Sequence, residues 1–274
     1  MRYQAFALGL LAACGVDSGT LTATVYGEEF IEEGIPAEEF SDGWSVSFDK
    51  FLVSIGNVAG KAGEGGDEVG DTSFHIVDLA QASNGDGFEL ASFDAPGGDY
   101  DHYGYQLRSD AGATALNAEA ADVTAMKAAG YAIWVQGSAT NGAESKTFDW
   151  GFTATYTFAH CDLGASIDGN ALVAQATIHA DHLFYDDAVS DEPNVAFQLL
   201  ADADGAAGSP PDGAITLDEL AAVDIRGETR YQVGSNTDLA GNTITNLRQY
   251  VELQSKTVGH INGEGHCEEQ LAQP

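Results

Sequence analysis

One alternating run of residues constrains the fold of this chain more than any other. Between Lys146 and His160, aromatic side chains recur at a period of two. Such a period is typical of a β-strand with one buried face. The side chains on that face are Phe148, Trp150, Phe152, Tyr156 and Phe158. We expect this strand to line the core of a β-sandwich; a ligand-binding groove is the alternative interpretation.

Shorter apolar runs separated by Gly and Asp turns predict more strands and favour an antiparallel β-sandwich, a mainly β fold, over residues 20–267. In residues 43–58 the alternation changes phase after Asp49, which predicts a bulge there. The other expected strands are 20–26, 74–79, 88–93, 100–108, 131–136 and 171–185. Helices are expected at 115–129, 193–201, 217–223 and 242–258, the last with Thr243 as a possible cap, and residues 268–274 as a tail.

The first residues resemble the signal of a bacterial lipoprotein. The apolar run from Ala5 to Ala13 is too short to span a bilayer, and it ends in a Leu-Ala-Ala-Cys sequence that resembles a lipobox. The resemblance implies cleavage of residues 1–13, lipidation of Cys14 and a tether over residues 14–19. We therefore expect a lipid-anchored protein of the cell envelope, facing the periplasm or the surface at the outer membrane. An ordinary cleaved signal, or a start codon assigned too late, is the alternative.

The remaining cysteines fit this location. Cys161 and Cys267 are expected to form a disulfide in an exported protein. The bond would close residues 161–267 into one loop, while a reactive or metal-binding cysteine is the alternative.

The charge of the chain excludes some partners. It has 43 Asp and Glu against 10 Lys and Arg, for a net charge of −33. Such a surface repels nucleic acid and anionic membranes, and it suits divalent cations or a saline habitat. No nucleic-acid partner is expected, and whether another protein or a small ligand binds is open.

The acidic segment from Ala201 to Leu220 is similar to an EF-hand or dockerin-like calcium loop. Calcium takes six to eight oxygen ligands, and the segment offers them in the EF-hand order. The expected ligands are Asp202, Asp204, Asp212, the carbonyl of Ala214, Thr216 and Glu219, within a helix–loop–helix excursion at about 193–224. Seven residues separate Asp204 from Asp212, where an EF-hand has one. The alternative is an acidic loop in which Thr216 and Glu219 form only a helix capping box.

Histidines form two further clusters, His179 with His182 and His260 with His266. Together with Asp181 they offer ligands suited to zinc or copper, provided that strand 171–185 lies beside the C-terminal segment. A period-two strand places His179 and His182 on opposite faces, so a joint site requires a bulge. The alternative is that His182 is a hydrogen-bonded core residue and that the C-terminal histidines are solvated.

Motifs of catalysis are missing from the sequence: it has no Gly-x-Ser-x-Gly, no His-Glu-x-x-His and no Walker loop. We therefore expect a non-catalytic, calcium-binding envelope lipoprotein with a structural calcium site. The alternatives are a periplasmic copper or zinc protein and a calcium-dependent hydrolase.

Several segments together resemble the methanobactin-associated periplasmic protein family. They are residues 51–58 (FLVSIGNV), the Pro-Gly-Gly-x-Tyr turn at 96–100, the Gly-Tyr-x-x-Trp segment at 130–134 and the aromatic strand that leads to His160 and Cys161. That family is associated with copper handling and a di-haem partner. The chain lacks much of the family's Trp and Cys pattern, so the resemblance implies no site residues and adds only to the copper alternative.

Overall fold

The computed structural model describes residues 16–208 and 210–274, so the expected signal peptide and Cys14 lie outside the described residues. The described chain is mainly β, and its strands form a four-stranded and a ten-stranded sheet, as expected for a sandwich-like fold. Among its helices, none is long and apolar enough to cross a membrane.

The smaller sheet has the order β13-β11-β1-β4. Its strands are β1 (Gly19–Tyr26), β4 (Phe88–Ala95), β11 (Ala171–Ile178) and β13 (Gly259–Ile261). β1 pairs antiparallel with β4 but parallel with β11, so the sandwich is not antiparallel throughout. The parallel pair matters for function because both strands end at the same edge of the sheet.

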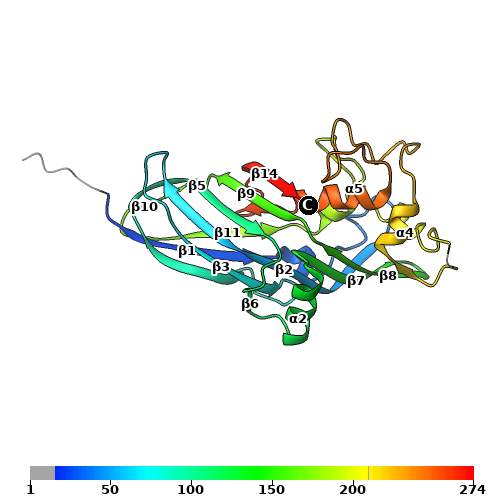
Figure 1. The fold of residues 1–274 in the computed structure, drawn as a ribbon, viewed down its shortest axis with the longest axis horizontal. Coiled ribbons are helices and arrows are strands. Elements are labelled where there is room, and N and C mark those ends of the chain that lie inside the picture. The colour runs from blue at the N-terminus through cyan, green and yellow to red at the C-terminus, as the bar shows by residue number, and fades with distance from the viewer. Residues whose placement is uncertain (1–15, 209) are drawn as a thin grey trace, which may run out of the picture.

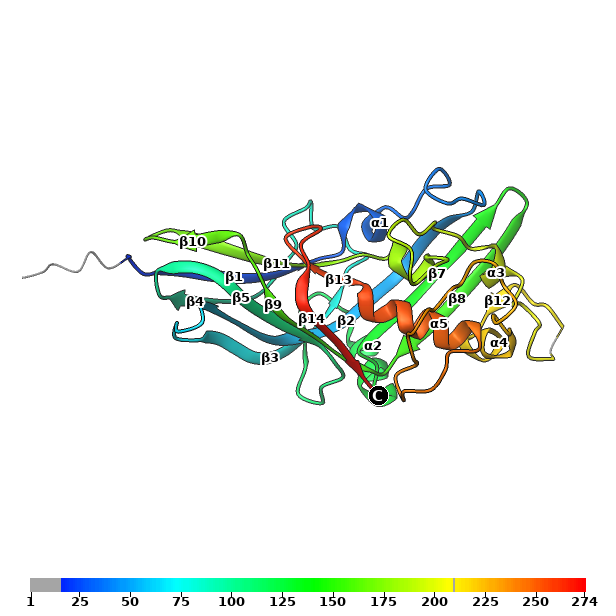
Figure 2. The same ribbon diagram turned by 90° about the horizontal axis from the view of Figure 1, so that it is seen from above.

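The larger sheet follows the order β12-β8-β7-β2-β5-β9-β14, with β3, β6 and β10 on its margins. Its strands are β2 (Ser45–Ala62), β3 (Val69–Asp78), β5 (Gly98–Leu107), β6 (Thr114–Ala115), β7 (Ile133–Asn141), β8 (Glu144–Phe152), β9 (Thr155–Cys161), β10 (Ala165–Ile167), β12 (Ala214–Ile215) and β14 (Cys267–Gln273). The first half of β2 pairs with β7 and the second half with β5, so β2 joins the two ends of an elongated molecule (Figures 1 and 2). The register shift between Phe48 and Lys50 confirms the bulge predicted near Asp49.

The aromatic stripe lies in the core. The structure divides the single strand expected over 146–160 into β8 and β9, which are separated by Thr153 and Ala154. The even-numbered positions stay on the buried face in both strands, and all five aromatic side chains are buried. Burial of side chains of this size contributes roughly 1.5–3 kcal/mol each. The core interpretation of the stripe is therefore confirmed.

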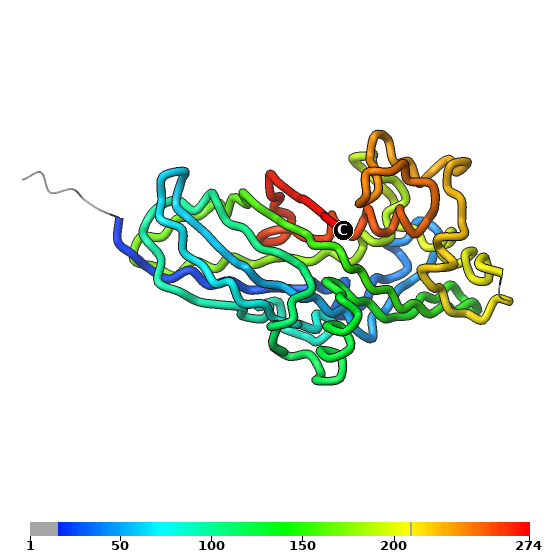
Figure 3. The backbone as a smooth tube through the Cα atoms, in the orientation of Figure 1, coloured from blue at the N-terminus to red at the C-terminus, as the bar shows by residue number. Residues whose placement is uncertain are grey.

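The predicted disulfide between Cys161 and Cys267 is present and links residues that are 106 positions apart. The two cysteines face each other in the pairing of β9 with β14. The prediction of a tail at residues 268–274 is wrong, because the backbone of residues 267–273 pairs with the free edge of β9. The C-terminus consequently lies at the middle of the molecule rather than at one end (Figure 3).

The helices are shorter than expected. They are α1 (Glu28–Glu32), α2 (Ala120–Ala129), α3 (Gln198–Ala201), α4 (Leu217–Ala222) and α5 (Leu247–Gln254), with the 3₁₀ turns η1 (Asp181–Phe184) and η2 (Ser255–Thr257). α2 begins late because residues 114–115 pair with β3. α5 is capped by Asn246, whose side chain accepts from the Gln249 amide, so the expected cap at Thr243 is wrong. α3, α4 and α5 gather at the end of the molecule opposite to residue 16 (Figures 1 and 2).

Candidate metal centre

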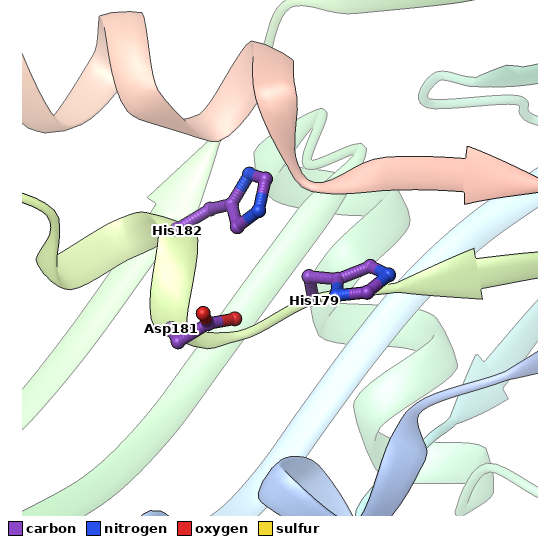
Figure 4. Close-up of side chains that lie close together, drawn as sticks. All are labelled: His179, Asp181 and His182. Atoms are coloured by element: carbon purple, nitrogen blue, oxygen red, sulfur yellow. The ribbon is translucent and has the colours of Figure 1, made fainter. Parts of the chain in front are cut away.

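The end of β11 brings two histidines together. The strand expected to reach residue 185 stops at Ile178, and Ala180 adopts a helical conformation with φ −73° and ψ −30°. The chain then turns through η1, so His179 and His182 do not lie on opposite faces, and their ring centroids are 5.4 Å apart (Figure 4). The predicted strand is wrong here, and a joint site forms without the bulge that it required.

The C-terminal histidine cluster reaches the same place. β13 pairs antiparallel with β11, which sets His260 opposite Thr177. The His260 ring centroid lies 4.3 Å from that of His179 and 5.1 Å from that of His182. Imidazoles bound to one tetrahedral ion have centroids roughly 5 Å apart, given metal–nitrogen distances of 2.0–2.1 Å. The two sequence clusters therefore meet around His179.

Two sets of possible ligand atoms share His179. One set is His179, Asp181 and His182, and the other is His179, His260 and Glu264; within each set the ligand atoms lie within 4.8 Å of one another. His266 belongs to neither set, although its ring centroid lies 4.8 Å from that of His260. Of the expected transition-metal ligands, His266 is exposed and lies at the periphery.

Hydrogen bonds determine which ring nitrogen of His182 carries the proton. Thr257 gives its hydroxyl proton to the Gln254 carbonyl at 2.9 Å, so it accepts from Nδ1 of His182 at 3.0 Å. A neutral imidazole has one N–H, which leaves the lone pair of His182 on Nε2. Burial, and then the neighbouring charge of His179, lower the pKa of His182 to about 4. Burial and the other imidazoles lower the pKa of His260 to about 3. Both residues are thus neutral near pH 7, the form that binds a metal.

Two atoms of the cluster are buried without a hydrogen-bond partner in the described chain: Oδ1 of Asp181 and Nδ1 of His260. The other carboxylate oxygen of Asp181 accepts from the Tyr185 hydroxyl at 2.8 Å. Buried polar atoms without a partner are uncommon and costly in native proteins. A cation bound to either atom would offset the cost of burying that atom.

Sequence reasoning missed four residues around the cluster: Glu28, Tyr185, Thr257 and Glu264. Oε2 of Glu28 lies 3.3 Å from Nδ1 of His179, and burial raises the pKa of the Glu28 carboxyl. Glu28 follows β1 as His179 follows β11, and these strands are parallel, so the two residues share one edge of the sheet. Only knowledge of that pairing could have placed Glu28 here.

The expected calcium ligands are arranged differently. Asp204 accepts from the amides of Asp212 and Gly213, and from Nζ of Lys146 at 2.9 Å. Glu219 accepts from the Gly205 amide and forms a capping box with Thr216, which confirms that part of the alternative interpretation.

The remaining members of this set have local partners. Asp202 accepts from the Gln198 side chain, and Asp212 accepts from the Ala214 amide. No three of these carboxylates bring their ligand atoms together within the described residues. The calcium site remains a prediction.

No family model matches the chain, and no curated protein matches its sequence. Among solved structures, the chain is similar to MbnP from Methylosinus trichosporium, with 13% identity over 73% of this chain and 94% of that chain and a TM-score of 0.37. The segments quoted above resemble the same family, but a likeness of this size carries no argument about fold, ligand or location.

Proposed function

We propose that this protein is a non-catalytic binder of a transition-metal ion, copper or zinc, outside the cytoplasm. The observation that carries the proposal is the histidine cluster, in which two sets of possible ligand atoms share His179. Within it, Oδ1 of Asp181 and Nδ1 of His260 are buried without a hydrogen-bond partner in the described chain. Buried polar atoms in native proteins usually have a hydrogen-bond partner.

The ligand types support copper or zinc over harder ions. Imidazole nitrogen with a carboxylate suits Zn²⁺ and Cu²⁺, whereas Ca²⁺ and Mg²⁺ prefer oxygen ligands only. The disulfide supports an oxidising location outside the cytoplasm. The lipobox-like sequence at residues 11–14 supports attachment to a membrane through Cys14.

Metal analysis of protein purified without an affinity tag tests the proposal. We expect about one equivalent of zinc or copper, which is lost when His182 and His260 are both replaced by Gln. His75→Gln is the matched control, because His75 lies on β3 and contacts Thr114 rather than the cluster. A wild-type protein that retains no stoichiometric zinc or copper after metal loading and dialysis would refute the function.

A second candidate function is calcium binding by the loop at 202–219. The observation that favours it is the order of elements: the short strand β12 is followed, after Thr216, by α4, which carries the expected last ligand Glu219. The proposed role is structural, because extracytoplasmic calcium is steady and its binding adds to folding stability. Thermal melting with millimolar calcium tests it, and an equal melting temperature with and without calcium, for wild type and Glu219→Gln alike, contradicts it.

A further inference from the structure

The two possible ligand sets differ in how firmly the protein holds their carboxylates. The inner set is His179, Asp181 and His182, and the outer set is His179, His260 and Glu264. Glu264 is exposed, whereas one carboxylate oxygen of Asp181 is fully buried. The contacts around Asp181 therefore bear on which of the two sets an ion would occupy.

Asp181 is held through one of its two carboxylate oxygens. The Tyr185 hydroxyl donates to Oδ2 of Asp181 at 2.8 Å. Oδ1 has no hydrogen-bond partner among the described residues, and Figure 4 shows that the carboxylate extends toward His179. Carboxylates that bind a metal are commonly hydrogen-bonded by a neighbouring residue, which fixes their orientation. Oδ1 is thus the oxygen that remains for an ion.

The same tyrosine contacts a second member of the inner set. The ring centroid of Tyr185 lies 4.6 Å from that of His182, and the two planes are inclined by 34°. Tyr185 directly follows η1, and its amide donates to the His182 carbonyl, so the backbone of this turn fixes where the ring lies. Tyr185 therefore orients Asp181 through its hydroxyl and His182 through its ring.

The two imidazoles of the inner set also have partners outside it. Nδ1 of His182 lies 3.0 Å from the Thr257 hydroxyl, and Nε2 of His179 lies 3.3 Å from the Gly263 carbonyl oxygen. A metal-binding imidazole normally makes such a contact through its second ring nitrogen. All three members of the inner set thus have the outer-shell contacts that are typical of metal ligands.

We propose that the ion rests in the inner set, that Asp181 binds it through Oδ1 alone, and that Tyr185 is the positioning residue that keeps Oδ2 off the ion. One oxygen and the imidazoles of His179 and His182 amount to three protein ligands. A zinc ion with three protein ligands keeps a fourth position for an exchangeable ligand. This assignment rests on the proposed function and adds to it the ligands and the coordination number.

Competition titrations of zinc against a chromophoric chelator compare Asp181→Asn with Glu264→Gln. Both variants remove one negative charge near His179, but only the first removes a member of the inner set. We expect Asp181→Asn to weaken zinc binding at least about tenfold more than Glu264→Gln does, the lower bound seen for outer-shell partners. A loss in Asp181→Asn that does not exceed the loss in Glu264→Gln would overturn the assignment.

Cobalt-loaded protein reports what Tyr185 does to the carboxylate, because four-coordinate Co²⁺ absorbs visible light more strongly than five-coordinate Co²⁺. Tyr185→Phe removes the donor to Oδ2, so that this oxygen is free to bind the ion as well. We expect weaker absorption per bound cobalt, together with about tenfold weaker zinc binding. Tyr100→Phe is the matched control, since it removes a hydroxyl on β5 that donates to the Pro96 carbonyl at 3.0 Å, and it should change neither quantity. A loss of stability alone does not alter the coordination number, so a wild-type cobalt spectrum in Tyr185→Phe would overturn the positioning role.

The outcomes separate this assignment from the function on which it rests. Wild-type protein that binds zinc, with Asp181→Asn and Glu264→Gln equally affected, overturns the assignment to the inner set and leaves metal binding intact. Wild-type protein that binds neither zinc, copper nor cobalt overturns the function itself. If Tyr185→Phe does not fold, the comparison of the two carboxylate variants still decides whether the ion rests in the inner set.

Discussion

The sequence predicts metal sites in two regions, the histidine cluster and the acidic loop at 202–219. The possible ligands of these two regions differ in the hydrogen bonds that they make within the protein. In the loop, Asp204 and Glu219 receive backbone amides, and Asp204 also receives Lys146. In the cluster, Asp181 and His260 each keep a buried polar atom without a hydrogen-bond partner in the described part of the chain. A sequence with the ligand order of a metal site therefore predicts binding poorly by itself. The hydrogen bonds that its carboxylates and imidazoles already make within the protein also have to be known.

Removing the disulfide should have the largest effect, because it closes the 106-position separation that contains both regions. We expect Cys161→Ala with Cys267→Ala to lower the free energy of unfolding by about 2–5 kcal/mol. Urea unfolding of reduced and oxidised wild type provides the control, since the variant should match the reduced protein. The variant can also be titrated with zinc and with calcium. Weaker zinc binding with unchanged calcium binding would mean that the histidine cluster depends on the attachment of β14 and that the acidic loop does not.

Replacing His182 and His260 by Gln should weaken zinc binding by at least about a hundredfold, the upper end of the loss seen when only an outer-shell partner is removed. Asp212→Asn in the loop should leave zinc binding unchanged, because Asp212 contacts the Ala214 amide and not the cluster. Competition with a chromophoric chelator measures both. Equal losses in the two variants would mean that the observed metal binds by diffuse surface charge.

The two regions should also lose stability in different pH windows. His182 and His260 are held neutral, with pKa values lowered from 6.5 to about 4 and about 3, so their contribution is present above pH 6.5 and is lost as the pH falls through these values. In the loop, the Lys146 contact lowers the pKa of Asp204 below 3.8. For Glu219, burial opposes the shift, but hydrogen bonds from Thr216 and Gly205 lower its pKa below 4.5.

Melting temperatures of the metal-free protein across this range measure the difference. Wild type should begin to lose stability below pH 6.5, and the His182→Gln, His260→Gln double variant should be flatter between pH 6.5 and 4.5. Loss of the loop's contribution should begin only below about pH 4.5 in both proteins. Identical profiles for the two proteins would show that the imidazoles do not control stability.

Lys146→Met should have the smallest effect and is the most direct way to make the loop resemble the cluster. It leaves the buried Asp204 carboxylate without its ammonium partner and should cost about 1–3 kcal/mol. Millimolar calcium should restore part of that loss if the loop is a latent cation site. The melting temperature with and without calcium decides this, and Lys61→Met, a variant of a lysine far from the loop in sequence that contacts the Glu64 carbonyl, serves as the control.

Local patterns predicted most of the fold, because alternation determines which face of a strand is buried. The aromatic stripe, the phase change at Asp49 and the disulfide all followed from residue spacing. The errors lie where long-range pairing decides: β14 forms because β9 has a free edge, and β6 forms because β3 has one. No residue near either segment signals that edge.

The sequence indicated which histidines form the candidate metal centre, but it did not indicate how they meet. The spacing of His179, Asp181 and His182 suggested a site. The turn at Ala180 that joins them is flanked by long-range contacts, because the His179 amide donates to the Val258 carbonyl and His182 contacts Thr257 of η2. Glu28 could not be found from the sequence, because 151 positions separate it from His179 and only the parallel pairing of β1 with β11 brings them together.

The bond between Cys161 and Cys267 also bears on how this protein survives damage. A protease that cuts the exposed chain between α4 and α5 would produce two fragments, with His179 and His182 on one and His260 on the other. The disulfide and the β11–β13 ladder would still hold those fragments together. A nicked molecule would therefore migrate as two pieces only after reduction, and its histidine cluster would stay assembled until then.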